Sequence, residues 1–172
     1  MRRTVDSGFT LVELIVVIIL IGIVSVYAAS RFFGVDSVSA PVAKEQIISV
    51  IRQVQLTRMQ NNINELSSYC RDSAPASSAQ RQQCLRSRLV IQPHCIGSAQ
   101  ACSLTDLSQR SDAVALSNLN FSTTTVLNEV DFDLLGNPQG SAGNGFTISI
   151  QGLDSRASVC VNPQGYVGGV CL

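Results

Sequence analysis

The feature that most constrains this chain is an almost wholly apolar run near its N-terminus, Phe9 to Ser30, in which Glu13 is the single charge. At ~1.5 Å per residue, these 22 residues form a helix of about 33 Å, long enough to cross the hydrocarbon core of a bilayer. Arg2 and Arg3 precede the run, and the positive-inside tendency leaves that end in the cytoplasm. We therefore expect a membrane helix with the remainder of the chain on the far side.

A secretory signal peptide is the alternative interpretation of this N-terminus. It also combines a basic start and an apolar run with a small-residue cleavage site, which Val26-Tyr27-Ala28 could provide. Glu13 argues against it, because an acidic side chain costs roughly 2.5 to 3.5 kcal/mol at the centre of a membrane helix, and less near the end. A signal peptide has no use for that charge.

The segment Gly8-Phe9-Thr10-Leu11-Val12-Glu13-Leu14 resembles the processing motif of the type IV pilin and type II secretion pseudopilin superfamily. Precursors of that superfamily carry Gly-Phe-Thr-Leu-x-Glu-Leu before a long apolar stretch. The resemblance implies that residues 1–8 are a leader, that a prepilin peptidase cuts between Gly8 and Phe9, and that the new amine of Phe9 is methylated. Residues 9–30 then remain as a transmembrane and assembly helix.

The same resemblance gives Glu13 a role in assembly. A carboxylate in hydrocarbon is tolerated when another charge pairs with it, and the partner expected here is the Phe9 ammonium of a neighbouring subunit. This pair supplies register rather than much net stability, because desolvation offsets most of the Coulomb gain.

The residues after the anchor predict a globular head over 31–172 that begins with an amphipathic helix. Apolar residues at positions 47, 48, 51 and 54 alternate with polar ones at helical spacing. Phe33-Gly34 and Pro41 interrupt the pattern, and a proline inside a helix removes a hydrogen bond. We expect either one long, curved or kinked helix over residues 10 to about 66, or two separate helices.

The C-terminal half predicts an antiparallel sheet. Alternating or β-branched residues indicate strands at 88–92, 113–116, 124–132, 146–150 and 158–161, with turn signals at 136–140 and 162–165. Together, the predicted helix and strands indicate an α+β chain. A long N-terminal helix packs on a sheet over 113–172, and a disulfide loop occupies 67–112. The resemblance names this arrangement a pilin fold.

The six cysteines all lie downstream of the apolar run. An even number in a small exported head indicates disulfides, with free buried thiols as the alternative. Closure of short loops favours three pairs: Cys70 with Cys84, Cys95 with Cys102, and Cys160 with Cys171. If 162–165 is a tight turn, Cys160 faces Val167, and the last pair then requires a bend at Gly168-Gly169.

Charge is distributed unevenly although the formal net charge is zero. Seven basic and three acidic residues lie between Lys44 and Arg88, whereas six acidic residues and one arginine lie between Asp106 and Asp154. This asymmetry suits a head that packs beside copies or relatives of itself, or it reflects two solvated faces. Nucleic acid is not a favoured partner, since the one basic cluster is Arg81, Arg86 and Arg88.

Catalytic chemistry has little support in this sequence. It contains no nucleophile elbow, phosphate loop or metal-ligand spacing, and His94 has no ligand-like companions. The alternation of Glu129, Asp131 and Asp133 lacks the spacing of an EF-hand and indicates a polar strand face. We expect no enzymatic activity, no metal site and no cofactor.

A second, looser resemblance concerns the segments 132–138 and 159–167, which are similar to the closing hairpins of minor pilins of the mannose-sensitive haemagglutinin (MSHA) and pseudopilin H types. It implies a minor subunit in the initiation or tip of a type IV pilus. A major pilin or a minor type II secretion pseudopilin is the alternative, and a DNA-binding or adhesive minor pilin is less favoured. The implied partners are other pilin or pseudopilin subunits, the prepilin peptidase, the assembly platform and the bacterial inner membrane, with the head in the periplasm.

Overall fold

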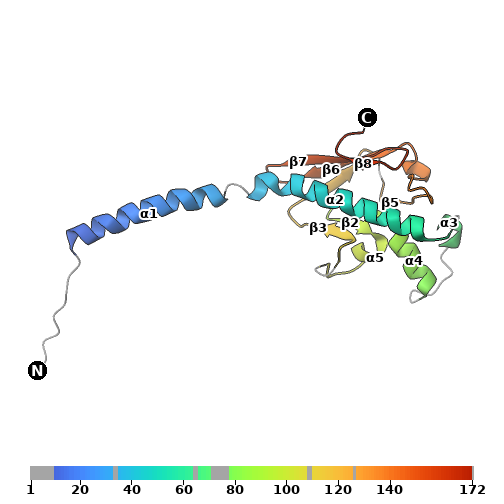
Figure 1. Cartoon of the computed structure of the whole chain (residues 1–172), viewed down its shortest axis with the longest axis horizontal. Coiled ribbons are helices and arrows are strands. Elements are labelled where there is room, and N and C mark those ends of the chain that lie inside the picture. The colour runs from blue at the N-terminus through green and yellow to red at the C-terminus, as the bar shows by residue number, and fades with distance from the viewer. Residues whose placement is uncertain are drawn as a thin grey trace, which may run out of the picture. The chain divides into compact units, whose positions relative to one another are not determined.

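The computed structural model describes residues 10–32, 35–63, 66–70, 78–107, 110–125 and 127–171 (Figure 1). The chain divides into two compact units, one ending at Val35 and the other beginning at Asp36. The first unit contains α1, and the second is the head. The helices are α1 (Leu11–Phe32), α2 (Val35–Gln60), α3 (Leu66–Tyr69), α4 (Ala79–Ser87), α5 (Ala99–Cys102) and a 3-10 turn at Gly140–Ala142.

The strands of the head form two antiparallel sheets. The first has the order β3-β2-β1-β5 and the second has the order β4-β6-β7-β8. Their bounds are β1 (Leu89–Gln92), β2 (Cys95–Ser98), β3 (Ala113–Ala115), β4 (Asn120–Thr123), β5 (Glu129–Val130), β6 (Phe146–Gln151), β7 (Arg156–Val161) and β8 (Val167–Gly168). The α+β class is confirmed. The strand expected at 88–92 is confirmed as β1. The expectation of one sheet confined to 113–172 is wrong, because β1 and β2, both within the segment 67–112, form a separate sheet with β3 and β5.

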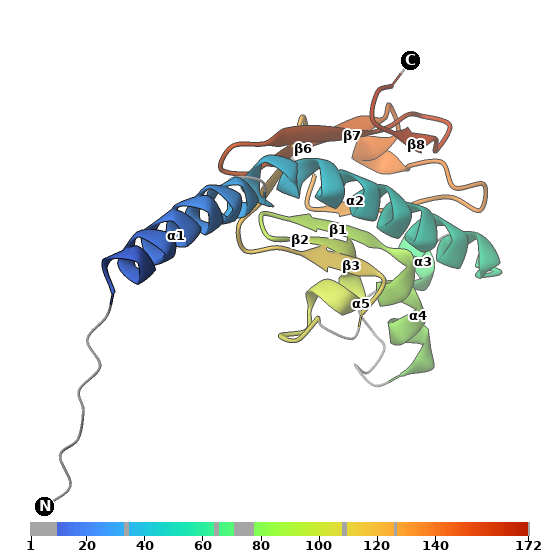
Figure 2. The ribbon, with the colours of Figure 1, turned by 60° about the vertical axis from the view of Figure 1, so that its left-hand side comes forward.

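Helix α2 joins the two sheets into one core. Figure 2 shows α2 running between β6, β7 and β8 on one side and β1, β2 and β3 on the other. Its apolar stripe is buried, with Ile47, Ile51 and Val54 at most 1% exposed. The first sheet contributes Leu89 and Ile96 to the same cluster, and the second contributes several apolar side chains of β4, β6 and β7. Burial of this stripe is the main reason that α2 forms here.

The sequence left open one helix over residues 10 to about 66 or two separate helices. The structure describes two helical segments, α1 and α2, and residues 33–34 between them lie outside the described part of the chain. Pro41 lies within α2, and α2 ends at Gln60. Asn61 then donates its N–H to the carbonyl of Arg58. This bond spans three residues instead of the four of an α-helical bond, and this tighter turn ends the helix.

The strand expected over 124–132 is interrupted in the structure. Its β-branched run favours a strand, but β4 ends at Thr123 and β5 begins only at Glu129. The Thr123 hydroxyl donates to the carbonyl of Thr125 and accepts from the N–H of Leu127. Such local side-chain bonds compete with the ladder, so this part of the sequence turns instead of pairing.

Three disulfides staple the head, and they are the pairs that short loops favour. They are Cys70–Cys84, Cys95–Cys102 and Cys160–Cys171, with Cα atoms 5.7, 5.9 and 5.5 Å apart. The expected facing of Cys160 and Val167 is wrong by one residue, because Cys160 pairs with Gly168. The turn is wider than expected, since the N–H of Asn162 donates to the carbonyl of Tyr166.

Candidate functional site

The N-terminal site is built around the start of α1. The Thr10 side chain accepts a hydrogen bond from the N–H of Glu13 at 3.3 Å, and the Thr10 carbonyl accepts from Leu14 at 3.2 Å. Threonine is a favourable N-cap, and an acidic residue in the first turn is favoured by the helix dipole. Glu13 therefore lies at a fixed place in the first turn of the helix. Gly8 and Phe9, the other two predicted site residues, lie outside the described residues.

The surface of α1 is apolar and uncovered within the first unit. The large apolar side chains from Leu11 to Val26 are between 43% and 75% exposed. Ser25 satisfies its hydroxyl within the helix by donating to the carbonyl of Ile21 at 2.7 Å. In the stretches that the structure describes, no helix reaches the combination of length and hydropathy expected of a membrane span.

A comparison with family models decides what this segment is. Residues 3–29 match the prokaryotic N-terminal methylation motif. The N-terminus is thus a type IV pilin-like prepilin signal, a motif that implies processing by a prepilin peptidase and interaction with other pilin subunits. The helix followed by antiparallel sheets is consistent with a pilin fold. No curated protein and no solved structure matches the chain.

Within the head, a basic side chain of the segment 44–88 is paired with acidic side chains of the segment 106–154. Arg88 binds Asp131 through two hydrogen bonds of 2.7 and 3.1 Å and also reaches Glu129 at 3.0 Å. The hydrogen bonding of the Arg88 guanidinium to the Asp131 carboxylate is the main cause that raises the pKa of Arg88. Arg110 binds Asp112 in a second bidentate pair. The charge asymmetry along the sequence is therefore partly neutralised within the head itself.

These pairs disperse the basic cluster that was considered for nucleic acid. Arg88 is engaged with the two acidic side chains, and the Nε of Arg86 donates to the side chain of Gln100 at 2.6 Å. Arg81 lies in the first turn of α4, where its N–H is capped by Ser78. The three arginines therefore do not act as one group, because Arg88 is ion-paired and Arg86 is hydrogen-bonded to Gln100.

The acidic alternation at 129, 131 and 133 is likewise explained by contacts within the head. Asp133 accepts hydrogen bonds from the N–H groups of Leu135 and Asn137, each at 2.8 Å. Burial alone would raise the pKa of Asp133, but these bonds outweigh it and lower the pKa below its ordinary value. Among the described residues, no group of acidic, histidine or cysteine side chains has the arrangement of a metal site. His94 lies in the turn between β1 and β2, with Nδ1 3.1 Å from the carbonyl of Leu119.

Sequence reasoning missed how α2 holds two similar loops together. The segments 137–140 and 162–165 both read Asn-Pro-Gln-Gly. The Gln55 amide donates to the carbonyls of Gly136 and Gly165, each at 2.8 Å. Arg52 donates to the carbonyl of Val167 at 2.9 Å from the same side of the helix. The repeated tetrapeptide was the available signal that these loops form one structural unit.

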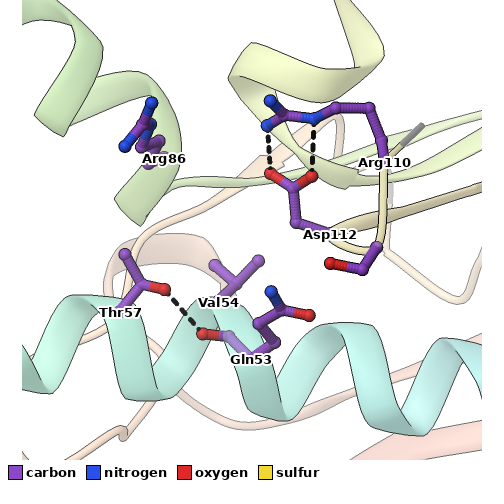
Figure 3. Close-up of a pocket in the computed structure, with 7 residues that line it drawn as sticks. Gln53, Val54, Thr57, Arg86, Arg110 and Asp112 are labelled. Atoms are coloured by element: carbon purple, nitrogen blue, oxygen red, sulfur yellow. Dashed lines mark hydrogen bonds and ion pairs between the residues drawn. The ribbon is translucent and has the colours of Figure 1, made fainter. Parts of the chain in front are cut away.

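It also missed a groove along the other side of α2. Three hollows of about 460, 370 and 340 Å³ follow one another along the helix. The first two share Arg110 and Ser111, and the second and third share Thr57 and Arg86. Figure 3 shows the middle hollow, with Gln53, Val54 and Thr57 on α2 and with Arg86, Arg110 and Asp112 around it. We call these three adjoining hollows together the α2–β3 groove.

Proposed function

We propose that this chain is a minor subunit of a type IV pilus-like filament and takes part in its initiation or tip. The observation that carries the proposal is Glu13, a carboxylate in the first turn of a helix whose other described side chains are almost all apolar. It lies inside the segment that matches the N-terminal methylation motif. A charge in this place needs a partner with the opposite charge once the helix is surrounded by hydrocarbon or by other helices.

The proposed mechanism starts at the precursor in the bacterial inner membrane. A prepilin peptidase removes residues 1–8, and Phe9 becomes the methylated N-terminus. Helix α1 anchors the subunit with its head in the periplasm, and its exposed apolar surface packs against other α1-type helices during assembly. The Glu13 carboxylate then receives the Phe9 ammonium of a neighbouring subunit, so that the next helix is added at a defined register.

The role is structural rather than enzymatic in this proposal. The minor rather than major assignment is supported by the absence of a proline near Ser30, a position where many major pilins carry one. The MSHA type is supported by the resemblance of the segments 132–138 and 159–167 to the closing hairpins of minor pilins. A minor pseudopilin of a type II secretion system shares the same N-terminal chemistry and remains the alternative. Copy number in sheared filaments and association with each machine's pilins distinguish these assignments.

Two measurements test the proposal. Mass spectrometry of the mature protein is expected to give an N-methylated chain beginning at Phe9, whereas a chain beginning near Ala29 or Ser30 indicates secretion. Glu13→Ala is expected to leave membrane insertion and cleavage intact but to remove the subunit from filaments. Ser25→Ala is the matched control on the same helix, since that hydroxyl bonds only within α1. Normal incorporation of the Glu13→Ala subunit refutes the assembly role.

A further inference from the structure

We propose that the α2–β3 groove binds the carboxyl-terminal end of an extended polypeptide, which adds as a strand to β3. This inference goes beyond filament assembly, because it concerns the head alone and a different kind of contact. It starts from the position of β3, which pairs with β2 on one side and is the terminal strand of its sheet. Its other edge lies along the first hollow of the groove, which Ala113, Val114 and Ala115 line.

The register of the ladder shows which backbone groups face the groove. The N–H of Ser98 donates to the carbonyl of Asp112 at 2.9 Å, and Ala113 lies opposite Gly97. In an antiparallel pair, hydrogen-bonded and non-hydrogen-bonded positions alternate, so Asp112 and Val114 bond to β2. The N–H and carbonyl groups of Ala113 and Ala115 therefore point away from β2, toward the open edge. They are the groups with which an added strand pairs.

Small residues allow β3 to pack closely against β2. A Cβ placed on Gly97 would lie 2.5 Å from the Ala113 Cα, so only glycine permits this approach of β2 and β3. The outward positions of β3 are alanines, which leave room for a neighbouring chain. Helix α2 forms the opposite wall, because Gln46, Ser49 and Val50 line the same hollow as β3.

The groove also has the dimensions and lining of a peptide site. Its α2 wall extends from Gln46 to Thr57, about 16 Å at ~1.5 Å per residue, which an extended peptide of about five residues spans. Val50 and Val54 form an apolar floor and are 4% and 1% exposed. The remaining lining combines amide and hydroxyl side chains with further apolar ones, and no aromatic side chain is among the lining residues that the structure describes.

Charge selects the carboxyl end of that peptide. Arg110 is neutralised by its bidentate pair with Asp112, whereas Arg86 has no ion pair among the residues with described side chains. Arg86 lines both the second and third hollows, beyond the start of β3 (Figure 3). A strand added antiparallel to β3 runs from Ala115 toward Asp112 and ends beside Arg86. A parallel strand would instead place its ammonium group there, against a like charge.

The experiment uses the full chain in detergent and a library of random pentapeptides displayed with free carboxyl ends. Enriched peptides are then synthesised with free and with amidated ends, and their dissociation constants are measured by fluorescence anisotropy. We expect an apolar or small last residue, and a loss of at least tenfold in affinity on amidation. Arg86→Gln is expected to weaken the affinity for the peptide with a free carboxyl end by about the same factor. It is expected to leave the affinity for the amidated peptide unchanged. Arg81→Gln, on the same helix but outside the lining, is expected to have no effect.

Ala115→Pro tests the strand addition. Proline removes an N–H that faces the open edge and is tolerated on edge strands, so it is expected to abolish binding without unpairing β2. Gln53→Trp, which fills the groove from the α2 wall, is the second variant and does not touch β3. Absence of enrichment, or binding that survives both Ala115→Pro and Gln53→Trp in folded protein, overturns the proposal. Glu13→Ala should leave peptide binding unchanged. The peptide-binding proposal can therefore be wrong while the filament-assembly proposal is right, and the reverse.

Discussion

Arg88 and Asp131, separated by 43 residues in the chain, form a bidentate ion pair across neighbouring strands, with Nε–Oδ1 and Nη2–Oδ2 distances of 2.7 and 3.1 Å. Their side chains are 28% and 27% exposed. Leu89 pairs with Val130 in the ladder, so the ion pair continues the register between β1 and β5 by one position. The ion pair connects the residue before β1 with the residue after β5.

The first prediction concerns this ion pair. A double-mutant cycle with Arg88→Met and Asp131→Asn is expected to give a coupling free energy of about 1 kcal/mol, above a typical exposed pair because the geometry is bidentate and partly buried. Urea unfolding of the single and double variants in detergent measures it. Arg81→Met is the control, with an expected change within about 0.5 kcal/mol. A coupling indistinguishable from zero would contradict the stabilising role.

The second prediction concerns acid stability through Asp112. Burial would raise the pKa of Asp112, but hydrogen bonds from Arg110 and Ser98 outweigh it and lower the pKa in the folded state. A lowered folded pKa means that the carboxylate stabilises the head above the unfolded value of about 3.9, and that this contribution is lost as the pH falls through the folded pKa. Unfolding midpoints of the wild type and Asp112→Asn should therefore differ at pH 6 and converge below pH 4. A difference that stays constant with pH would contradict this account.

The third prediction concerns the contact between the two loops. Gly165 has φ +78°, and a Cβ there would collide with the carbonyl of Gly136. Gly140 has φ +60° but open space around the same position. Gly140→Ala is expected to cost about 1 kcal/mol for the left-handed backbone alone, and Gly165→Ala at least about 2 kcal/mol more. Thermal unfolding of the two variants compares them, and equal losses would rule out the steric explanation.

The fourth prediction concerns Gln55, which is 7% exposed and donates to both loops. Gln55→Leu leaves two carbonyls without their donor, and we expect a loss of about 2 kcal/mol in the free energy of unfolding. Gln60→Leu, at an exposed position of the same helix, serves as the control for helix propensity. Hydrogen exchange should also increase at Gly165, whose N–H is bonded within its loop. Unchanged exchange there would show that α2 does not hold the loop.

The strands were predicted where their signal is local. Residues 146–150 and 158–161 alternate between inward and outward positions, and both lie within the observed strands β6 and β7. The run 124–132 is interrupted because the hydroxyl of Thr123, just before it, bonds to the backbone of Thr125 and Leu127, which residue propensity does not show. The pairs of cysteines that short loops favoured are the ones that the fold brings together, since a short loop is the cheapest to close.

The sequence by itself determined the N-terminal signal, the apolar helix with its one carboxylate, and the amphipathic stripe of α2. Each of these depends on residues within a few helical turns of one another. The tertiary structure alone decided that β1 and β2 belong to a separate sheet, that Arg88 meets Asp131, and that β3 leaves an open edge beside α2. The physical reason is that strand partners and ion pairs form between distant segments. Their choice depends on which complete arrangement buries the apolar stripe of α2, and no local pattern contains that information.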